Sequence, residues 1–374
     1  MEATRSVRGG TDIPPTQASL DDRLVLVPDD VPALDASKHS VPLEAVYFDT
    51  FQTINRAVPL TEANSELIES LRDAIPPIHE PIYEQGRDAT WLRDLDMVLG
   101  YAVNGGAWAY PLRILNFHEI VNDHLDGEPV LISYCPLCYS GVVYMRALGE
   151  QVLTFGNTSA LYESDMVMLD YNTGSYWWQV AGRAIVGPLT DERLTVLPSM
   201  TTTWGNWRLL YPESLVLSQE TGFDRNYSRD PFLGIADSIN RGNFAFPVSA
   251  AALDERLLPG ERVLVVGLEE EVRAYPVESL ANGVFSDSLG GQELVVFVQN
   301  GAGAAYLLRV EGQSLSFVAV DNGFRDEHSG TMWDFAGRAL EGDLAGLQLE
   351  RLPSKTTFWF AIVAAEPEIT IHSE

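Results

Sequence analysis

The chain has 374 residues, 46% hydrophobic and 21% charged, which is enough to bury a large core in two or three domains. This composition excludes intrinsic disorder and collagen. Against 53 Asp and Glu residues stand 24 Lys and Arg residues, giving a net charge of −29. Because binding phosphates requires clustered cations, we expect neither nucleic acid nor an anionic membrane as a partner. Two interpretations of the acidity stay open: adaptation to salt, or a plain acidic protein.

The chain begins with a segment rich in glycine and proline, and residues 1–30 predict a flexible N-terminal arm. Residues 1–11 lack the apolar core of a signal peptide, and no run reaches the roughly 18 apolar residues of a membrane helix. The sequence as written therefore predicts a soluble, cytoplasmic protein. If an upstream signal had been removed, the protein would be exported or associated with the cell envelope.

An internal repeat organises the rest of the chain. The motif Ala109-Tyr110-Pro111 recurs as Ala274-Tyr275-Pro276, and Trp178 aligns with Trp333 further on. These matches predict two tandem homologous modules that arose by internal duplication. The predicted division is a first module with the candidate site over 31–217, a connecting segment over 218–258, and a second, degenerate module over 259–374.

Each module has mostly the pattern of strands. Apolar runs predict strands over 130–134, 141–145 and 166–169, with others over 263–266 and 294–297. After Pro111, the spacing of apolar residues predicts one short helix over 112–121. The expected fold class is therefore β-rich α+β with short helices. Long amphipathic helices between strands, which doubly wound nucleotide folds need, are missing.

The two cysteines, Cys135 and Cys138, lie between two predicted strands, and the second module has no counterpart. A turn between strands is unlike the helix start that activates a thioredoxin thiol. It resembles the knuckle of rubredoxins and zinc ribbons, where two thiolates face one metal ion. On the inner face of the predicted helix, His118 is the predicted third ligand, and zinc or copper is the predicted ion.

Several states of the cysteine pair stay open: a metal site, a structural disulfide, a redox-active pair, or two inert buried thiols. Two cysteines and one histidine leave an open fourth position, which is typical of a metal-dependent enzyme. Glu119 and Asp123 are then the candidate catalytic carboxylates. The alternative is a non-catalytic ligand-binding or copper-handling protein.

Two further groups of residues are weaker candidates. Met166 and Met168 offer thioethers that suit copper(I), although core packing explains both residues as well. In the connecting segment, Arg225 and Arg229 are candidates for binding an anionic small molecule. The alternative for both arginines is a surface loop held by ion pairs.

Five motifs spread over nearly the whole chain carry a family resemblance. They are Val31-Pro32-Ala33-Leu34-Asp35, the run from Ala109 to Asp123, Tyr134-Cys135-Pro136-Leu137-Cys138, Leu153-Thr154-Phe155-Gly156 and Arg229-Asp230-Pro231. Together they resemble the prokaryotic family catalogued as domain of unknown function 3179. The resemblance implies no established activity, and it implies that relatives often carry an export or lipoprotein signal. The family tends to have a glycine after the second cysteine, where this chain has Tyr139.

Overall fold

The computed structural model describes residues 27–28, 30–321 and 323–372, so most of the predicted arm over 1–30 lies outside the described residues. The chain is β-rich, with 41% strand and 13% helix, which confirms the predicted class. No helix in the described ranges has the length and apolar character needed to cross a membrane.

The described α-helices are short, as expected. Two of them have a side-chain cap: Asn64 accepts from the backbone N–H of Leu67 at 2.8 Å, and Thr203 accepts from that of Asn206 at 3.3 Å. The α-helices are α2 (Ser65–Leu71), α3 (Leu112–His118), α4 (Trp204–Leu210), α5 (Ile235–Asn240) and α6 (Trp359–Ala365), and the 3-10 helices are η1 (Leu43–Ala45), η2 (Leu60–Glu62), η3 (Gly86–Asp88) and η4 (Ala251–Leu253).

Two sheets come from the first part of the chain, with the orders β14-β13-β12-β11-β1-β2 and β16-β4-β5-β17-β3. Their strands pair antiparallel except β17 and β5, which are parallel. The strands of the first sheet are β14 (Arg183–Val186), β13 (Tyr176–Trp178), β12 (Asp165–Asp170), β11 (Phe155–Tyr162), β1 (Val46–Asp49) and β2 (Ala57–Pro59). Those of the second are β16 (Ser199–Thr203), β4 (Met97–Val103), β5 (Gly106–Pro111), β17 (Leu215–Leu217) and β3 (Tyr83–Gln85).

A third sheet joins both parts of the chain, in the order β30-β19-β18-β29-β8-β7-β6, with β15 also paired to β8. The junction is the pairing of Thr356 in β29 with Gly141 in β8. The strands are β30 (Thr370–Ile371), β19 (Glu271–Tyr275), β18 (Arg262–Leu268), β29 (Ser354–Phe358), β8 (Ser140–Met145), β7 (Glu128–Cys135), β6 (Ile120–Leu125) and β15 (Val196–Leu197).

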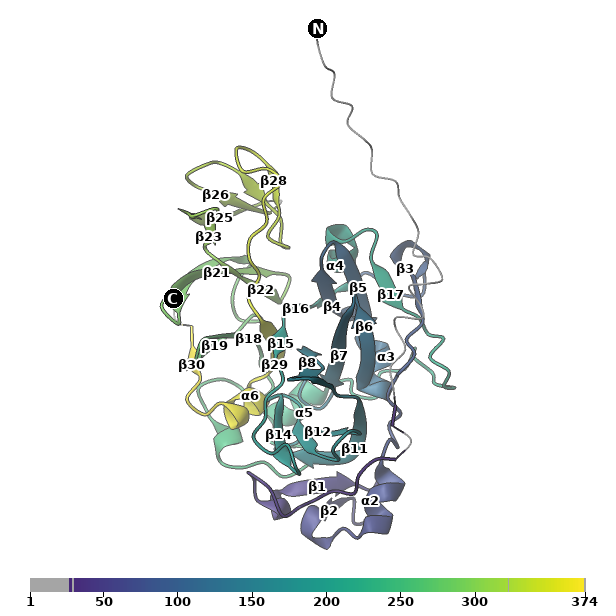
Figure 1. Ribbon diagram of the computed structural model, residues 1–374. Helices are drawn as coiled ribbons and strands as arrows, with labels where there is room; N and C mark the ends of the chain where they lie inside the picture. The colour runs from purple at the N-terminus through teal and green to yellow at the C-terminus, as the bar shows by residue number, and fades with distance from the viewer. Residues whose placement is uncertain (1–26, 29, 322, 373–374) are drawn as a thin grey trace.

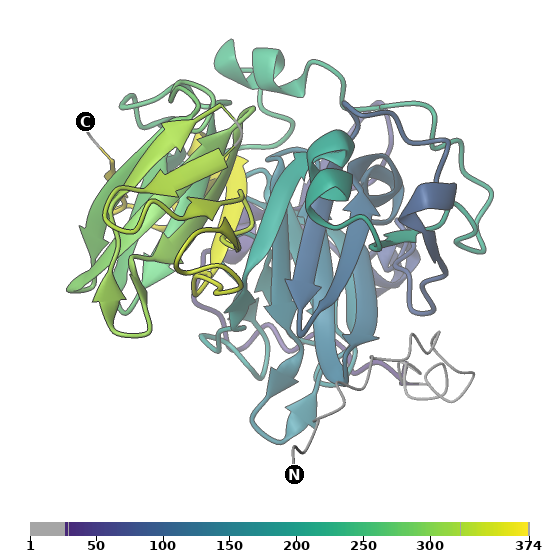
Figure 2. The same cartoon turned by 90° about the horizontal axis from the view of Figure 1, so that it is seen from above.

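The second part of the chain adds a three-stranded and a four-stranded sheet, seen as a green lobe beside the blue-to-teal first part (Figure 2). Their strands are β20 (Gly283–Leu289), β21 (Gln292–Gln299) and β22 (Ala302–Leu307), and β25 (Phe317–Val320), β26 (Gly323–Asp326), β27 (Met332–Trp333) and β28 (Ala339–Glu341). Two small hairpins complete the described strands: β9 (Ala147–Leu148) with β10 (Gln151–Val152), and β23 (Arg309–Val310) with β24 (Gln313–Ser314).

Strand pairings recur along the chain. The hairpin β4-β5 is flanked by β16, antiparallel to β4, and by β17, parallel to β5; the hairpin β18-β19 is flanked in the same way by β29 and β30. Next to equivalent bulges, Trp177 pairs with Ala184 and Trp333 pairs with Ala339. In this pattern of pairings Trp333 takes the place of Trp177, whereas the sequence alignment placed it opposite Trp178. That the two parts arose by duplication stays a prediction.

The hydrophobic cores cross between the two parts of the chain. Helix α6 buries Trp359 and Phe360 in the cluster that contains Cys138 and the β11 and β12 strands of the first part. Helix α4 conversely buries Trp204 and Trp207 in the cluster that contains residues of β21 and β22 from the second part. Each part therefore contributes to a core of the other, and the cysteines lie in the core that α6 completes.

Candidate metal centre

The Cys-x-x-Cys motif forms the turn between β7 and β8, which confirms its predicted position in a hairpin. Cys135, the last residue of β7, pairs with Ser140, the first residue of β8. From β29, the backbone N–H of Phe358 donates to the carbonyl of Cys138 at 2.8 Å, and the hydroxyl of Thr357 donates to it at 3.1 Å. The turn that carries the thiols is therefore fixed by a strand more than 200 residues away.

Asp165, the first residue of β12, lies against this turn. One carboxylate oxygen of Asp165 and the Sγ atoms of Cys135 and Cys138 all lie within 4.8 Å of one another, and all three residues are buried. The Cys138 thiol donates to Oδ1 of Asp165 at 2.7 Å, and the backbone N–H of Val180 donates to Oδ2 at 2.8 Å. Two thiols and one oriented carboxylate thus converge on a single point inside the core.

Burial decides the protonation of this group. It raises the pKa of both thiols, and that of Cys138 is raised well above its ordinary value. Burial also raises the pKa of Asp165 to about 6, against hydrogen bonds from Cys138 and Val180 that lower it. The raised pKa values keep the thiols protonated in the absence of an ion, whereas a bound cation would stabilise the thiolates and the carboxylate together.

His118 lies outside this group of ligand atoms. Its Nδ1 lies 2.8 Å from the carbonyl oxygen of Pro76, and its Nε2 lies 2.6 Å from the hydroxyl of Tyr227. The predicted helix over 112–121 is too long: α3 ends at His118 because Glu119 has a left-handed φ of 59°, and β6 begins at Ile120. That His118 is a metal ligand stays a prediction, and in the structure Asp165 is the residue beside the two thiols.

The two candidate catalytic carboxylates lie in different surroundings. Oε2 of Glu119 accepts a hydrogen bond of 2.6 Å from Asn157, and burial raises the pKa of Glu119 to about 8, with the charge of Asp165 acting in the same direction. Asp123 instead accepts hydrogen bonds from the hydroxyls of Tyr83 at 2.5 Å and Tyr110 at 3.3 Å. Glu119 is therefore the one whose charge interacts with the cysteines.

The remaining candidates separate as well. Met166, 3% exposed, follows Asp165, and its Sδ lies 3.5 Å from Nδ2 of Asn157, whereas Met168 is a fully buried core residue. Arg229 lines a cavity of about 680 Å³. Arg225 is not part of that wall, and its guanidinium donates to the carbonyl of Asp224 at 3.3 Å.

The residue that the sequence analysis missed is Asp165. Its signal was weak: an acidic residue directly before the two methionines already noted, in a strand with an otherwise apolar pattern. A carboxylate at the start of a buried strand requires a hydrogen-bond donor or a cation as a partner. This requirement is the signal by which Asp165 could have been identified.

The family follows from comparison with known proteins. The model of the family described as "Protein of unknown function (DUF3179)" matches residues 72–369. The chain therefore belongs to the DUF3179 family, which confirms the resemblance found in its motifs. Neither curated proteins nor solved structures provide a match to the chain.

Proposed function

We propose that this protein binds one transition-metal ion through the thiolates of Cys135 and Cys138 and the carboxylate of Asp165. The observation that carries the proposal is the convergence of three buried ligand atoms within 4.8 Å of one another. In a tetrahedral zinc site with Zn–S bonds of about 2.3 Å, ligand atoms are roughly 3.8 Å apart. The group is therefore close to this size, but Cys138 Sγ and Oδ1 of Asp165, 2.7 Å apart in a hydrogen bond, must separate by about 1 Å once the thiol proton gives way to the ion.

Zinc is the favoured ion. Zinc accepts thiolate together with carboxylate, whereas copper(I) prefers soft sulfur ligands alone. The charge of Glu119 acts on the Cys135 thiol, but its carboxylate lies outside the group of three ligand atoms and accepts from Asn157. The three principal ligands are at most 1% exposed, and such burial favours an ion that fixes β12 against the β7-β8 hairpin over one that meets a substrate.

The recurring strand pairings support the internal duplication, which we include in the proposal together with the division at 31–217, 218–258 and 259–374. In the second part of the chain, the turn between β21 and β22 is Asn300-Gly301, with no thiol. One copy would then have kept the metal site, while the other kept only the scaffold.

The test is metal analysis of the full-length protein, purified under reducing conditions, beside a count of free thiols. We expect about one equivalent of zinc, lost in Cys135→Ser, Cys138→Ser and Asp165→Asn, and a chelator should lower the melting temperature. His118→Gln is the matched comparison, since it removes the histidine predicted from sequence but leaves the buried group intact.

The proposal is wrong if the protein carries less than about a tenth of an equivalent of metal and takes up neither zinc nor copper(I) when reduced. In that case two free thiols would indicate an inert pair, and none would indicate a disulfide. Loss of metal in His118→Gln with retention in Asp165→Asn would instead restore the ligand set predicted from sequence.

A further inference from the structure

A second site lies outside the metal centre, in the cavity of about 680 Å³ beside the β7-β8 turn. Pro136 and Tyr139 of the turn line it, whereas the two cysteines do not. Its other walls come from α3, from the segment 227–237, and from Arg262 and Phe358. Its volume lies within the roughly 300–1,000 Å³ that is usual for small-molecule sites.

The charges of the wall balance one another. Four arginines face four acidic residues: Arg93, Arg113, Arg229 and Arg262 against Asp96, Asp230, Asp237 and Glu278. Asp96 accepts from both Arg93 and Arg113, at 3.3 and 3.1 Å, and Glu278 accepts from Arg262 at 2.6 Å. An organic anion would meet these carboxylates and a cation these guanidinium groups, so the wall favours a ligand without net charge.

Aromatic rings form much of the remaining wall. The ring of Tyr139 stacks on Phe358 with centroids 5.5 Å apart, and the guanidinium of Arg262 lies 5.2 Å from the centre of the Tyr139 ring. Tyr227 and Phe232 face the same cavity. The aromatic rings can pack against the C–H groups of a ligand, and the guanidinium groups beside them can donate to its hydroxyls. The wall therefore suits a molecule that has both.

Two polar groups of the wall are free to hydrogen-bond with a ligand. Tyr134 lines the cavity and is only 4% exposed, and its hydroxyl has no hydrogen-bond partner among the described residues. The hydroxyl is not among the fully enclosed polar atoms that lack a partner, so it reaches the open space of the cavity and can donate to a ligand hydroxyl there. The neighbouring Arg229 is exposed and has no acidic partner in the described part of the chain, so its guanidinium is available as well.

From these features we infer that the cavity binds an uncharged, polyhydroxylated small molecule of the carbohydrate class. Tyr134 donates to one ligand hydroxyl, Arg229 donates to a pair of neighbouring hydroxyls, and the aromatic rings cover the sugar face. The site does not require the metal ion, because the wall and the buried ligand group share no residue.

The experiment is isothermal titration calorimetry of the full-length protein with maltose, cellobiose, sucrose and trehalose, and with benzoate and phosphate as anionic probes. We expect at least one disaccharide to bind and neither anion to do so. Tyr134→Phe should weaken that binding roughly fivefold, as loss of one neutral hydrogen bond does. Arg229→Gln should weaken it by about tenfold, as loss of a charged hydrogen bond does.

The matched controls come from the same chain. Tyr101→Phe removes a hydroxyl from another tyrosine that is 4% exposed but lies outside the cavity wall, and Arg225→Gln alters a nearby exposed arginine of the same segment. Both should bind as the unaltered protein does.

Three results would overturn the inference. The first is that none of the four disaccharides binds up to about 50 mM, well above a millimolar Kd. The second is that an anion binds and no disaccharide does. The third is that the cavity variants and their controls bind the disaccharide equally weakly. Metal content is measured in a separate experiment. A failure to bind disaccharides therefore does not count against the metal site, and the absence of metal does not count against the disaccharide site.

Discussion

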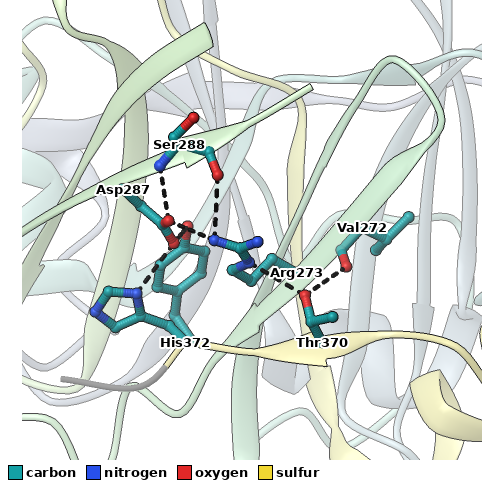
Figure 3. A network of polar contacts seen from close by, with 7 residues as sticks. Val272, Arg273, Asp287, Ser288, Thr370 and His372 are labelled. Carbon is teal, nitrogen blue, oxygen red and sulfur yellow. Dashed lines mark hydrogen bonds and ion pairs between the residues drawn. The ribbon is translucent and has the colours of Figure 1, made fainter. Parts of the chain in front are cut away.

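The carboxylate of Asp287 ties the C-terminal strand to the sheets of the second part of the chain (Figure 3). It forms an ion pair with Arg273 of β19 and accepts hydrogen bonds from the hydroxyl of Tyr275 and the backbone N–H of Ser288, both at 2.7 Å. Nδ1 of His372, just after β30, lies 3.0 Å from the same carboxylate. Asp287→Asn should therefore loosen three elements at once.

The size of the effect follows from the pKa. Burial raises the pKa of Asp287, but the hydrogen bonds from Arg273, Tyr275 and Ser288 outweigh it and lower the pKa from 3.8 to about 2. That difference corresponds to about 2.4 kcal/mol. Because Arg273 is partly exposed, solvent screening reduces the contribution to about 1 to 2 kcal/mol. A lowered carboxyl pKa stabilises the fold above pH 3.8, and this stability is lost as the pH falls towards 2.

The assay is urea unfolding of the full chain, followed by tryptophan fluorescence at pH 7 and pH 3. We expect Asp287→Asn to lower the free energy of unfolding by about 1 to 2 kcal/mol at pH 7, and by roughly half as much at pH 3. Asp343→Asn is the control for charge, because Asp343 is exposed and its change should stay within about 0.5 kcal/mol. An equal loss at both pH values would refute the electrostatic argument.

Three other predictions concern charge and strain. The net charge of −29 makes the folded chain repel itself, and 1 M potassium chloride screens this repulsion by shortening the Debye length to about 3 Å. The melting temperature should therefore rise by several degrees between dilute buffer and 1 M potassium chloride. A flat or falling melting temperature would exclude salt adaptation. Burial raises the pKa of Glu119 to about 8, so the metal-free protein should lose stability as the pH rises from 4.5 to 8. Glu119→Gln should lose less over this range, because only Asp165, with its pKa raised to about 6, then contributes. Parallel urea midpoints for the two proteins would contradict this. Tyr139 has a left-handed φ of 51°, a strain that glycine would relieve, but Tyr139→Gly also loses the ring contacts to Phe358 and Arg262. The loss of contacts should dominate and lower the free energy of unfolding in urea by about 1 to 2 kcal/mol. A more stable variant would show that the backbone strain dominates instead.

Features that depend on neighbouring residues were predictable from the sequence. The apolar runs predicted the strands now seen in β7, β8, β12, β18 and β21. The Cys-x-x-Cys turn was predicted because it lies between two such runs, and the family because its motifs are local. The helix over 112–121 was predicted too long, since nothing in its apolar spacing shows that Glu119 adopts a left-handed backbone and ends it.

Tertiary structure alone decided which residues meet. Asp165 is 27 residues from Cys138 in sequence and joins it only because β12 packs against the β7-β8 turn in the shared core. The side of a strand that faces a neighbour depends on its register, and a shift of one residue reverses it. The same holds for His118, which faces Tyr227 once its helix has ended, and for the cores that α4 and α6 complete in opposite parts of the chain. Composition and pattern determined the elements, whereas the site arises from long-range packing, which no local spacing encodes.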